Sequence, residues 1–232
     1  MATYRDPIIT YDNEYVYTPS DDSFLIIDYL KKNLNKKSFD GIPIESIQNV
    51  LDMGTGTGII ALFLALAKEN IKDFKSKIIA SDISENALKC AKLNEKHNNL
   101  SNEITFIKSN LFASFPNSYK NSFSVIIFNP PYLPSISNTD YSDNHNNINE
   151  NNDLTWDGGK QGFNIILKFL NQSKFYIKRS KRSHIYYITS SKTDLDLFYD
   201  ILDRNGYKNQ IIEREHYFFE DIILNRIDSM NF

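Results

Sequence analysis

Apolar residues follow two alternating patterns between residues 49 and 204. Short runs rich in β-branched residues predict five buried strands, at residues 50–53, 77–82, 104–107, 125–128 and 185–189. Segments with apolar residues at helical spacing predict four helices, at residues 59–67, 84–97, 163–179 and 194–204. Strands that alternate with helices are typical of a parallel sheet covered on both faces, so the pattern predicts an α/β fold.

The two ends of the chain follow other patterns. Residues 1–46 predict an extended lead-in, then a helix capped by Ser20 or Asp21, and a loop from residue 31 onward. At the other end, residues 209–213 and 218–227 predict two strands that pair antiparallel.

One segment interrupts the alternation of strands and helices. Residues 143–152 are polar and rich in asparagine, and they cannot bury enough apolar surface to become ordered, so we expect a mobile insert there. No internal repeat is visible. We therefore expect residues 1–232 to form a single domain around this insert.

Composition and charge narrow the function classes. Hydrophobic residues make up 41% of the chain and charged residues 24%, as in an ordinary soluble globular protein. The net charge of −3 does not indicate a surface that binds nucleic acid. A local basic patch stays open at residues 174–182, although a solvated helix end explains the same residues.

Cys90 is the one cysteine of the chain, which excludes an internal disulfide and a cysteine-based zinc site. Because it stands among Leu88 and two alanines, we interpret it as a small buried hydrophobe. The N-terminus has no apolar core of signal-peptide type, and no apolar run approaches the length that spans a bilayer. We therefore expect no membrane partner and a cytoplasmic location, with the nucleus as an alternative.

The sequence Gly-Thr-Gly-Thr-Gly connects a predicted strand to a predicted helix. Gly54, Gly56 and Gly58 permit unusual φ angles and let a ligand approach the backbone, although their spacing is not the Gly-x-Gly-x-x-Gly of dinucleotide-binding domains. Asp82 ends the next strand, where a carboxylate can accept hydrogen bonds from a ribose diol. Asp52 precedes the turn and could face a ligand's ammonium group. Helix capping or turn formation explains both aspartates as well.

Asn129, Pro130, Pro131 and Tyr132 follow the predicted strand 125–128. Neither proline has an N–H for a ladder, so the strand stops there and Asn129 stands at its C-terminal end. Ligands bind at that end of the strands in open α/β sheets. A plain proline turn, with Asn129 as the turn former, accounts for the same residues without a function.

Asn110 and Leu111 follow the predicted strand 104–107. Asn110 is placed to accept a hydrogen bond from an adenine amino group while Leu111 covers the ring. An asparagine in an ordinary turn is the alternative.

Together these motifs resemble the S-adenosylmethionine-dependent methyltransferases that have a seven-stranded sheet. Residues 50–58 with Asp82 are similar to the cofactor site of that class, and the Asn-Pro-Pro-Tyr sequence resembles its signature for methylating planar nitrogens. Three further segments resemble the HemK-like release-factor glutamine methyltransferases, in their short eukaryotic and archaeal form: residues 17–24, 155–162 and 214–227. The segment 155–162 contains Trp156 and matches the family's Trp-x-Gly-Gly-x-x-Gly element.

The resemblance implies a fold, a reaction and a set of site residues. The fold is a Rossmann-like sheet, mostly parallel, with an antiparallel C-terminal hairpin. The reaction is methyl transfer from S-adenosylmethionine, without a metal, to the glutamine amide of the Gly-Gly-Gln loop in a class I translation release factor. The expected cofactor-binding residues are Tyr17, Asp22, Ser23, Asp52, Gly54, Gly56, Gly58, Asp82, Asn110, Leu111 and Asn129.

Three residues of the proline turn are expected to carry the transfer itself. The side-chain oxygen of Asn129 and the carbonyl of Pro130 each accept one N–H of the amide, and the ring of Tyr132 packs against it. The resemblance implies no catalytic histidine. Asn110 stands where the family commonly has aspartate, and its amide oxygen can still accept a hydrogen bond.

The resemblance also implies a partner. Short-form relatives are typically activated by a small zinc-binding protein that adds a β-strand beside the third strand, here residues 104–107. An ordinary edge strand is the alternative. Two other functions stay open: N6-adenine methylation of nucleic acid, which uses the same Asn-Pro-Pro-Tyr signature, and a methyltransferase-like scaffold without catalysis.

Overall fold

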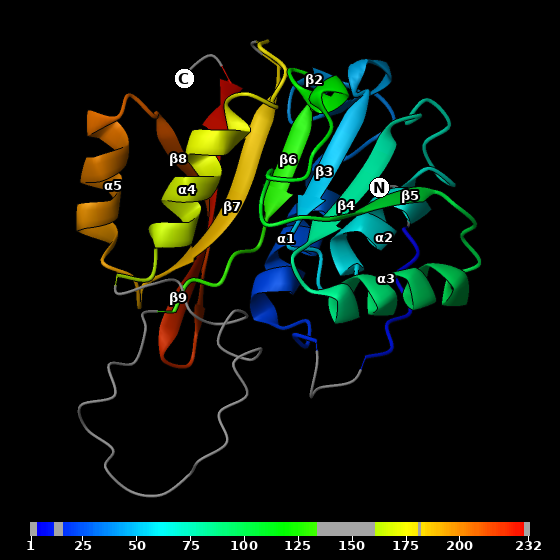
Figure 1. Cartoon of the computed structure of the whole chain (residues 1–232), viewed down its shortest axis with the longest axis horizontal. Coiled ribbons are helices and arrows are strands. Elements are labelled where there is room, and N and C mark those ends of the chain that lie inside the picture. The colour runs from blue at the N-terminus through cyan, green and yellow to red at the C-terminus, as the bar shows by residue number, and fades with distance from the viewer. Residues whose placement is uncertain (1–3, 12–15, 134–160, 181, 230–232) are drawn as a thin grey trace, which may run out of the picture.

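The computed structural model describes residues 4–11, 16–133, 161–180 and 182–229. Within these ranges, seven strands form one sheet in the order β5-β4-β3-β6-β7-β9-β8 (Figure 1). Strands β5, β4, β3, β6 and β7 run parallel, while β9 lies antiparallel to both β7 and β8. Their bounds are β3 (Asn49–Met53), β4 (Lys77–Asp82), β5 (Ile104–Lys108), β6 (Val125–Phe128), β7 (His184–Ser190), β8 (Asn209–Tyr217) and β9 (Glu220–Asp228). The predicted α/β fold with an antiparallel C-terminal hairpin is confirmed.

Helices cover both faces of this sheet. The described helices are α1 (Asp21–Asn33), α2 (Ile59–Ala67), α3 (Glu85–His97), α4 (Asn164–Ser173) and α5 (Leu195–Arg204). Helices α1 and α2 contribute to one hydrophobic core, and α4 and α5 to a second. The alternation of side chains along the strands creates both cores: on β4, Ile78 and Ala80 join the first core and Ile79 joins the second.

Helix α4 is shorter than predicted. It ends at Ser173, whereas the apolar spacing predicted a helix over residues 163–179. After the helix the chain turns so that Ile177, which is fully buried, forms a parallel bridge with Phe123. Burial of Ile177 therefore overrides the helical pattern. The basic run 174–182 follows this helix instead of forming its last turn.

A small hairpin lies in the segment predicted to be a loop. Strands β1 (Ser38–Phe39) and β2 (Ile42–Pro43) pair antiparallel around a two-residue turn of Asp40 and Gly41. Both turn residues have positive φ, 51° and 81°, as a type I′ turn requires. An Asp-Gly pair between Phe39 and Ile42 is a local hairpin signal, so the sequence does contain the information that predicts this element.

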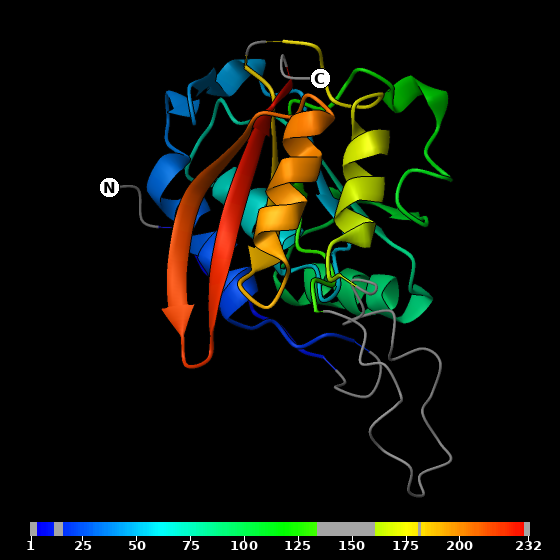
Figure 2. The same ribbon diagram turned by 90° about the vertical axis from the view of Figure 1, so that its left-hand side faces the viewer.

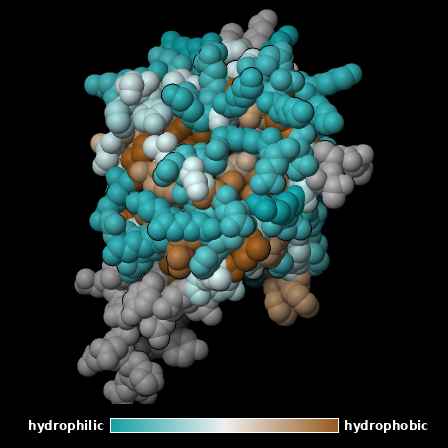
Figure 3. All heavy atoms as spheres, turned by 90° about the vertical axis from the view of Figure 1, so that its right-hand side faces the viewer, coloured by the Kyte–Doolittle hydropathy of each residue, from teal (hydrophilic) through white to brown (hydrophobic). Residues whose placement is uncertain are grey.

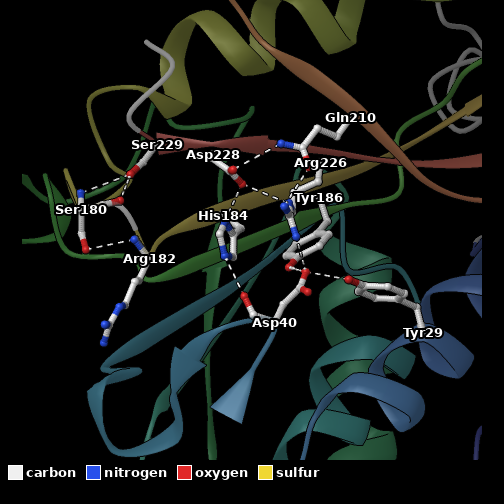
Figure 4. A network of polar contacts seen from close by, with 10 residues as sticks. All are labelled: Tyr29, Asp40, Ser180, Arg182, His184, Tyr186, Gln210, Arg226, Asp228 and Ser229. Atoms are coloured by element: carbon white, nitrogen blue, oxygen red, sulfur yellow. Dashed lines mark hydrogen bonds and ion pairs between the residues drawn. The ribbon is translucent and has the colours of Figure 1, made fainter.

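Asp40 ties that hairpin to the main sheet. Its Oδ2 accepts hydrogen bonds from Tyr29 at 2.6 Å, Tyr186 at 2.5 Å and Arg226 at 2.8 Å (Figure 4). Arg226 also pairs with Asp228 of the same strand at 3.0 Å. Burial by itself would raise the pKa of Asp40, but the three hydrogen bonds outweigh it and lower that pKa. The network fixes the N-terminal hairpin against β7 and β9.

The C-terminal hairpin differs in detail from its prediction. Strand β8 runs to Tyr217, beyond the predicted 209–213, and β9 begins at Glu220 instead of residue 218. Phe218 has a φ of 38°, so it forms the turn and cannot continue a strand. Figure 2 shows the long hairpin along one side of the molecule, with α1 behind it, and α1 contacts both strands.

The remaining expectations concern Cys90, membrane-spanning helices and two sequence segments. Cys90 is only partly buried, and its Sγ donates to the carbonyl of Thr10 at 3.3 Å, so the prediction of a buried hydrophobe is wrong. The N-terminal segment runs across α3 there and offers that polar partner. None of the helices in the described ranges is long and apolar enough to cross a membrane. The asparagine-rich segment 143–152 and residues 155–160 of the Trp156 element lie outside the described residues.

Candidate active site

The carboxyl ends of β3, β4 and β5 lie side by side, and the loops that follow β3 and β5 are bonded to the last two residues of β4. Thr55 N donates to Ser81 O at 2.9 Å, and Ser109 N donates to Asp82 O at 2.9 Å. The structure therefore brings the glycine turn, Asp82 and the Asn110 loop to the edge where open α/β sheets bind ligands.

The glycine turn has one open position. Gly54, Gly56 and Gly58 have φ values of 64°, 54° and 87°, a region that side chains disfavour. A Cβ at Gly54 would lie 3.0 Å from the ring of Phe128, and one at Gly58 would lie 3.0 Å from Ala91 Cβ. A Cβ at Gly56 would meet nothing within 4 Å. Packing explains two of the glycines, and Gly56 is the one whose backbone faces space that a ligand can use.

Asp82 is held in place by the backbone. Its Oδ2 accepts from Gly56 N at 2.9 Å and its Oδ1 accepts from Ser84 N at 2.8 Å. Burial raises the pKa of Asp82 although these N–H groups act in the opposite direction. Each oxygen keeps a second lone pair. The carboxylate is thus fixed at the end of β4, as a receptor for two adjacent hydroxyls requires.

Asp52 carries an incomplete set of hydrogen bonds. It is 1% exposed, and its Oδ2 accepts from Thr55 Oγ1 at 2.6 Å and from Ala61 N at 3.2 Å. Its Oδ1 is buried and has no partner within the described part of the chain. Burial, with a smaller contribution from the charge of Asp82, raises the pKa of Asp52 to about 7. A cationic group next to Oδ1 would complete this site.

Asn129 presents a similar unpaired acceptor at the end of β6. Its Nδ2 donates to Ser23 Oγ at 3.3 Å, which orients the amide group. Its Oδ1 is buried and lacks a donor among the residues that the structure describes. An unpaired buried acceptor costs about 1–3 kcal/mol, so such atoms point to a missing ligand.

Asp22 joins the lead-in and α1 to the proline turn. Its Oδ2 accepts from the hydroxyls of Tyr17 at 2.9 Å and Tyr132 at 3.2 Å, and its Oδ1 accepts from Ser23 N at 2.5 Å. Burial first, and then the charge of Asp22, raises the pKa of both phenols, so both remain protonated donors. The hydroxyl of Tyr132 anchors the turn. Asp22 and Ser23, predicted to bind cofactor, thus contact the predicted catalytic residues Tyr132 and Asn129 directly, and Tyr17 joins them through Asp22.

Asn110 and Leu111 are adjacent in sequence but differ in their exposure to solvent. Asn110 is exposed just after β5, whereas Leu111 is 6% exposed and belongs to the second core. Leu111 has a φ of 49°, which turns the chain sharply at this point. The exposed amide of Asn110 is available to a ligand. The expected contact between Leu111 and an adenine ring stays a prediction.

Two residues near the proline turn, Thr193 and Glu220, were not predicted from the sequence to lie at the site. Thr193 Oγ1 donates to the carbonyl of Tyr132 at 3.1 Å. Glu220, at the start of β9, contributes to the raised pKa of Tyr132 after burial, Asp22 and Tyr17. Thr193 reaches the site because β7, which precedes it, neighbours β6, and Glu220 reaches it because β9 neighbours β7. The helix predicted from residue 84 begins with Ser84 as its N-cap, whose side chain accepts from Ala87 N at 3.3 Å.

The described histidines have other surroundings. His184 Nδ1 lies 2.8 Å from Asp228, His216 Nδ1 lies 2.7 Å from Asp221, and His97 is exposed. Within the described ranges, no group of three or more histidine, cysteine, aspartate or glutamate side chains has an arrangement that could hold a metal ion.

Known proteins match this chain over most of its length. The family model of the methyltransferase small domain matches residues 25–174. A Methanocaldococcus jannaschii protein named "Putative protein N5-glutamine methyltransferase MJ0928" is 34% identical over 209 residues, 90% of this chain and 89% of that protein. The Schizosaccharomyces pombe "eRF1 methyltransferase catalytic subunit mtq2" is 27% identical over 212 residues, 86% of this chain and 84% of that protein.

A solved structure is similar in fold. The E. cuniculi Mtq2–Trm112 complex, described as responsible for methylating the eRF1 translation termination factor, has a chain that matches with a TM-score of 0.58 at 19% identity. The match covers 92% of this chain and 98% of that chain. At this identity the likeness shows the fold alone.

Proposed function

We propose that this chain, which belongs to the methyltransferase small domain family, methylates the side-chain amide nitrogen of a protein glutamine and uses S-adenosylmethionine as the methyl donor. The observation that carries the proposal is Asn129: a buried, oriented amide oxygen with no donor in the described residues, at the end of β6. The substrate that we propose is the Gly-Gly-Gln loop of a class I translation release factor, in line with the names of the M. jannaschii and S. pombe relatives. A protein that methylates a translation release factor would act in the cytoplasm, and this is the location that we propose.

The residues at the strand ends fit the proposed cofactor. Asp82 would accept hydrogen bonds from the two ribose hydroxyls, and the unpaired Oδ1 of Asp52 would receive the ammonium group. The open face of Gly56 lets the ligand approach the backbone. Asn110 would accept from the adenine amino group. When bound, S-adenosylmethionine supplies a methyl group attached to a positively charged sulfur.

The chain's own residues would prepare the amide for this methyl group. An amide nitrogen is a poor nucleophile because its lone pair is delocalised into the carbonyl. Asn129 Oδ1 and the Pro130 carbonyl would each accept one N–H, which fixes the nitrogen in line for transfer and favours the positive charge that develops on it. The two prolines stiffen the turn, so these acceptors need little rearrangement. As the new N–C bond forms, the bond between the methyl group and sulfur would break, the nitrogen would lose one proton to solvent, and S-adenosylhomocysteine would be the second product.

Ser23 and Asp22 would act as positioning residues for this chemistry. Ser23 holds the amide group of Asn129 so that its oxygen, and not its nitrogen, faces the substrate. Asp22 holds Tyr132 through its hydroxyl, which leaves the ring to pack against the flat amide. This is a revision of the expectation that these lead-in residues bind the cofactor itself.

The rival function is methylation of an adenine amino group in nucleic acid. The described surroundings of Tyr132 speak against it, because the negative charges of Asp22 and Glu220 lie near that ring. A polyanionic substrate would be repelled from such a rim. The alternative of a scaffold without catalysis does not account for the unpaired buried oxygens of Asp52 and Asn129.

One experiment separates these functions. The protein is incubated with labelled S-adenosylmethionine and, in separate reactions, a class I release factor, a Gly-Gly-Gln peptide or an adenine-containing oligonucleotide. We expect label on the release factor and, by mass analysis, one added methyl group on its Gly-Gly-Gln peptide. Label on the oligonucleotide alone would contradict the proposal, and no label with all three would favour the scaffold.

We further propose a small activating partner at β5. This strand is one edge of the seven-stranded sheet, so its outer backbone groups are available for pairing with another chain. The E. cuniculi neighbour was solved as a complex with Trm112. In the proposal the partner is a small zinc-binding protein. Expression alone, compared with co-expression, tests it: full solubility and activity without a partner would contradict an obligate heterodimer.

A further inference from the structure

The turn between β8 and β9 exposes two phenylalanine rings. Phe218 is 92% exposed and Phe219 is 85% exposed, more than any other large hydrophobic side chain for which exposure is described. Figure 3 shows a hydrophobic protrusion at the lower right, at the corner where Figure 2 places the hairpin turn from the opposite side. Two adjacent aromatic rings in water are a poor arrangement for a protein unless a partner covers them.

The turn stands at the active-site end of the sheet. The last residue of β7, Ser190, pairs with Ile222, and Ser191 N donates to Asp221 O at 2.9 Å. Glu220, the residue after the two rings, accepts a hydrogen bond from Ser190 and contributes to the electrostatic surroundings of Tyr132. The two rings therefore lie beyond the carboxyl ends of the parallel strands, at the same end of the sheet as the candidate site and close to Tyr132.

Carboxylates lie near Tyr217, the residue before the two rings, while Arg214 of the same hairpin pairs with Asp221. The hydroxyl of Tyr217 donates to Glu215 at 2.6 Å. The pKa of this phenol is raised by burial, by Glu215 and by the charges of Asp21 and Asp28 on α1. Carboxylates from two elements thus gather on one side of the turn. A partner with basic residues around an apolar hollow complements such a surface.

The hairpin is also rigid enough to present the rings. Strands β8 and β9 pair up to the turn itself, where Tyr217 faces Glu220, and Arg214 Nε lies 3.0 Å from Asp221 Oδ2. A rigid element loses little conformational entropy when it binds. The hairpin lies at the opposite edge of the sheet from β5, so a chain paired with β5 leaves it free.

We infer that the turn of residues 217–220 is a docking element for the protein substrate, in which Phe218 and Phe219 enter an apolar hollow bordered by basic residues. The inference rests on the proposed function. Docking there would hold the substrate protein while its glutamine loop reaches Asn129. A short peptide that contains only the loop would not reach the turn, so the element would distinguish a whole protein from a peptide.

The test is a double variant, Phe218→Asn with Phe219→Ser. Asparagine tolerates the positive φ of 38° at residue 218, and both side chains are exposed, so the fold is expected to survive. We expect kcat/KM for a whole release factor to fall about tenfold or more, mainly through KM, since aromatic side chains are frequent anchors at interfaces. We expect kcat/KM for a Gly-Gly-Gln peptide to stay unchanged.

The matched control is Phe175→Ser. Phe175 is 54% exposed and lies after α4, where its carbonyl accepts from Asn121 N at 3.1 Å, far along the chain from the hairpin. We expect this variant to turn over both substrates normally. Equal kinetics of the double variant and the wild type with the whole protein would overturn the inference. An equal loss with protein and peptide would also overturn it, because it would indicate damage to the site.

Failure of the proposed function gives a different result. In that case the wild-type protein would methylate neither the release factor nor the peptide, whatever role the hairpin has.

A second copy of this chain is the other partner that could cover the two rings, and analytical sedimentation tests for such a dimer. A wild-type dimer that the double variant converts to a monomer would overturn the inference.

Discussion

At the scale of single residues, two buried oxygens that have no donor among the described residues define the candidate site. Asp52 Oδ1 and Asn129 Oδ1 lie at the ends of β3 and β6, which are neighbours in the sheet. Each belongs to a side chain whose other polar atom is already bonded, Asp52 by Thr55 and Asn129 by Ser23. The fold therefore fixes the direction of both unpaired oxygens before any ligand arrives.

The first prediction concerns Asn129. Asn129→Ala removes the acceptor that orients the amide, and we expect kcat to fall by a factor of about 100 to 1,000 or more, as for other preorganised electrostatic groups. S-adenosylmethionine binding, measured by calorimetry, should stay within about twofold. Near-normal turnover by this variant would contradict the mechanism.

The second prediction concerns Ser23, which touches Asn129 and is proposed to act only through it. Ser23→Ala frees the amide group to rotate, and we expect kcat to fall about tenfold, the effect of one hydrogen bond of about 1.4 kcal/mol. KM should change little, and Ser23→Thr should restore most of kcat. A fall in cofactor affinity with unchanged kcat would instead return Ser23 to the cofactor site.

The third prediction uses the raised pKa of Asp52. The unfolded carboxyl loses its proton near pH 3.9, whereas the folded one keeps it to about pH 7, so the ligand-free fold loses stability as the pH rises between these values. Asp52→Asn cannot ionise. We expect the variant to gain about 2–4 kcal/mol relative to the wild type between pH 5 and pH 8, in urea titrations. Parallel pH profiles of the two proteins would show that Asp52 ionises normally.

At the scale of elements, short turns determine where the strands end and which parts of the molecule they reach. The type I′ turn of Asp40 and Gly41 lets the N-terminal hairpin reach the sheet, and the turn at Phe218 ends β8 at the mouth of the site. Helix α4 stops early because Ile177 is needed in the core. In each place a tertiary contact or a positive φ overrules the local pattern of apolar residues.

The fourth prediction tests the attachment of the N-terminal hairpin. The lowered pKa of Asp40 means that its charge stabilises the fold above about pH 4 and that this contribution is lost as the pH falls through the folded pKa. Asp40→Asn keeps the positive φ but loses the charged hydrogen bonds. We expect a loss of about 1–3 kcal/mol at pH 7 that shrinks below pH 4. Urea titrations at both pH values measure it, and a pH-independent difference would contradict the role of the charge.

At the scale of the whole molecule, the proposed ligand would contact the ends of several strands that are separated along the sequence. Gly56, Asp82 and Asn129 follow β3, β4 and β6, and Ser23 comes from α1. A bound cofactor would therefore brace the centre of the sheet, while the two edges, β5 and β8, remain available to proteins.

The fifth prediction follows from that bracing. At a concentration of about 100 times its Kd, S-adenosylmethionine should stabilise the fold by about 2.7 kcal/mol, which raises Tm by roughly 5–10 °C in a chain of this size. Asp82→Ala should remove most of the shift. An equal shift in this variant would remove Asp82 from the site.

The sequence by itself determined the succession of strands and helices along the chain from β3 to β9, and it named the polar residues that stand at the candidate site. Short apolar runs rich in β-branched residues are a local property, so they predicted β3, β4, β5, β6 and β7 nearly to the residue. The glycine turn, Asp82 and Asn129 are also local, because each follows a strand and the carboxyl ends of parallel strands share one edge.

Only the tertiary structure decided which distant residues meet there. Ser23 and Asn129 are 106 positions apart, and Tyr132 and Asp22 are 110 apart, so no spacing rule could pair them. The same holds for Glu220, which reaches Tyr132 because β9 inserts between β7 and β8. Contacts of this kind depend on the order of strands in the sheet, which the pattern along a single chain does not specify.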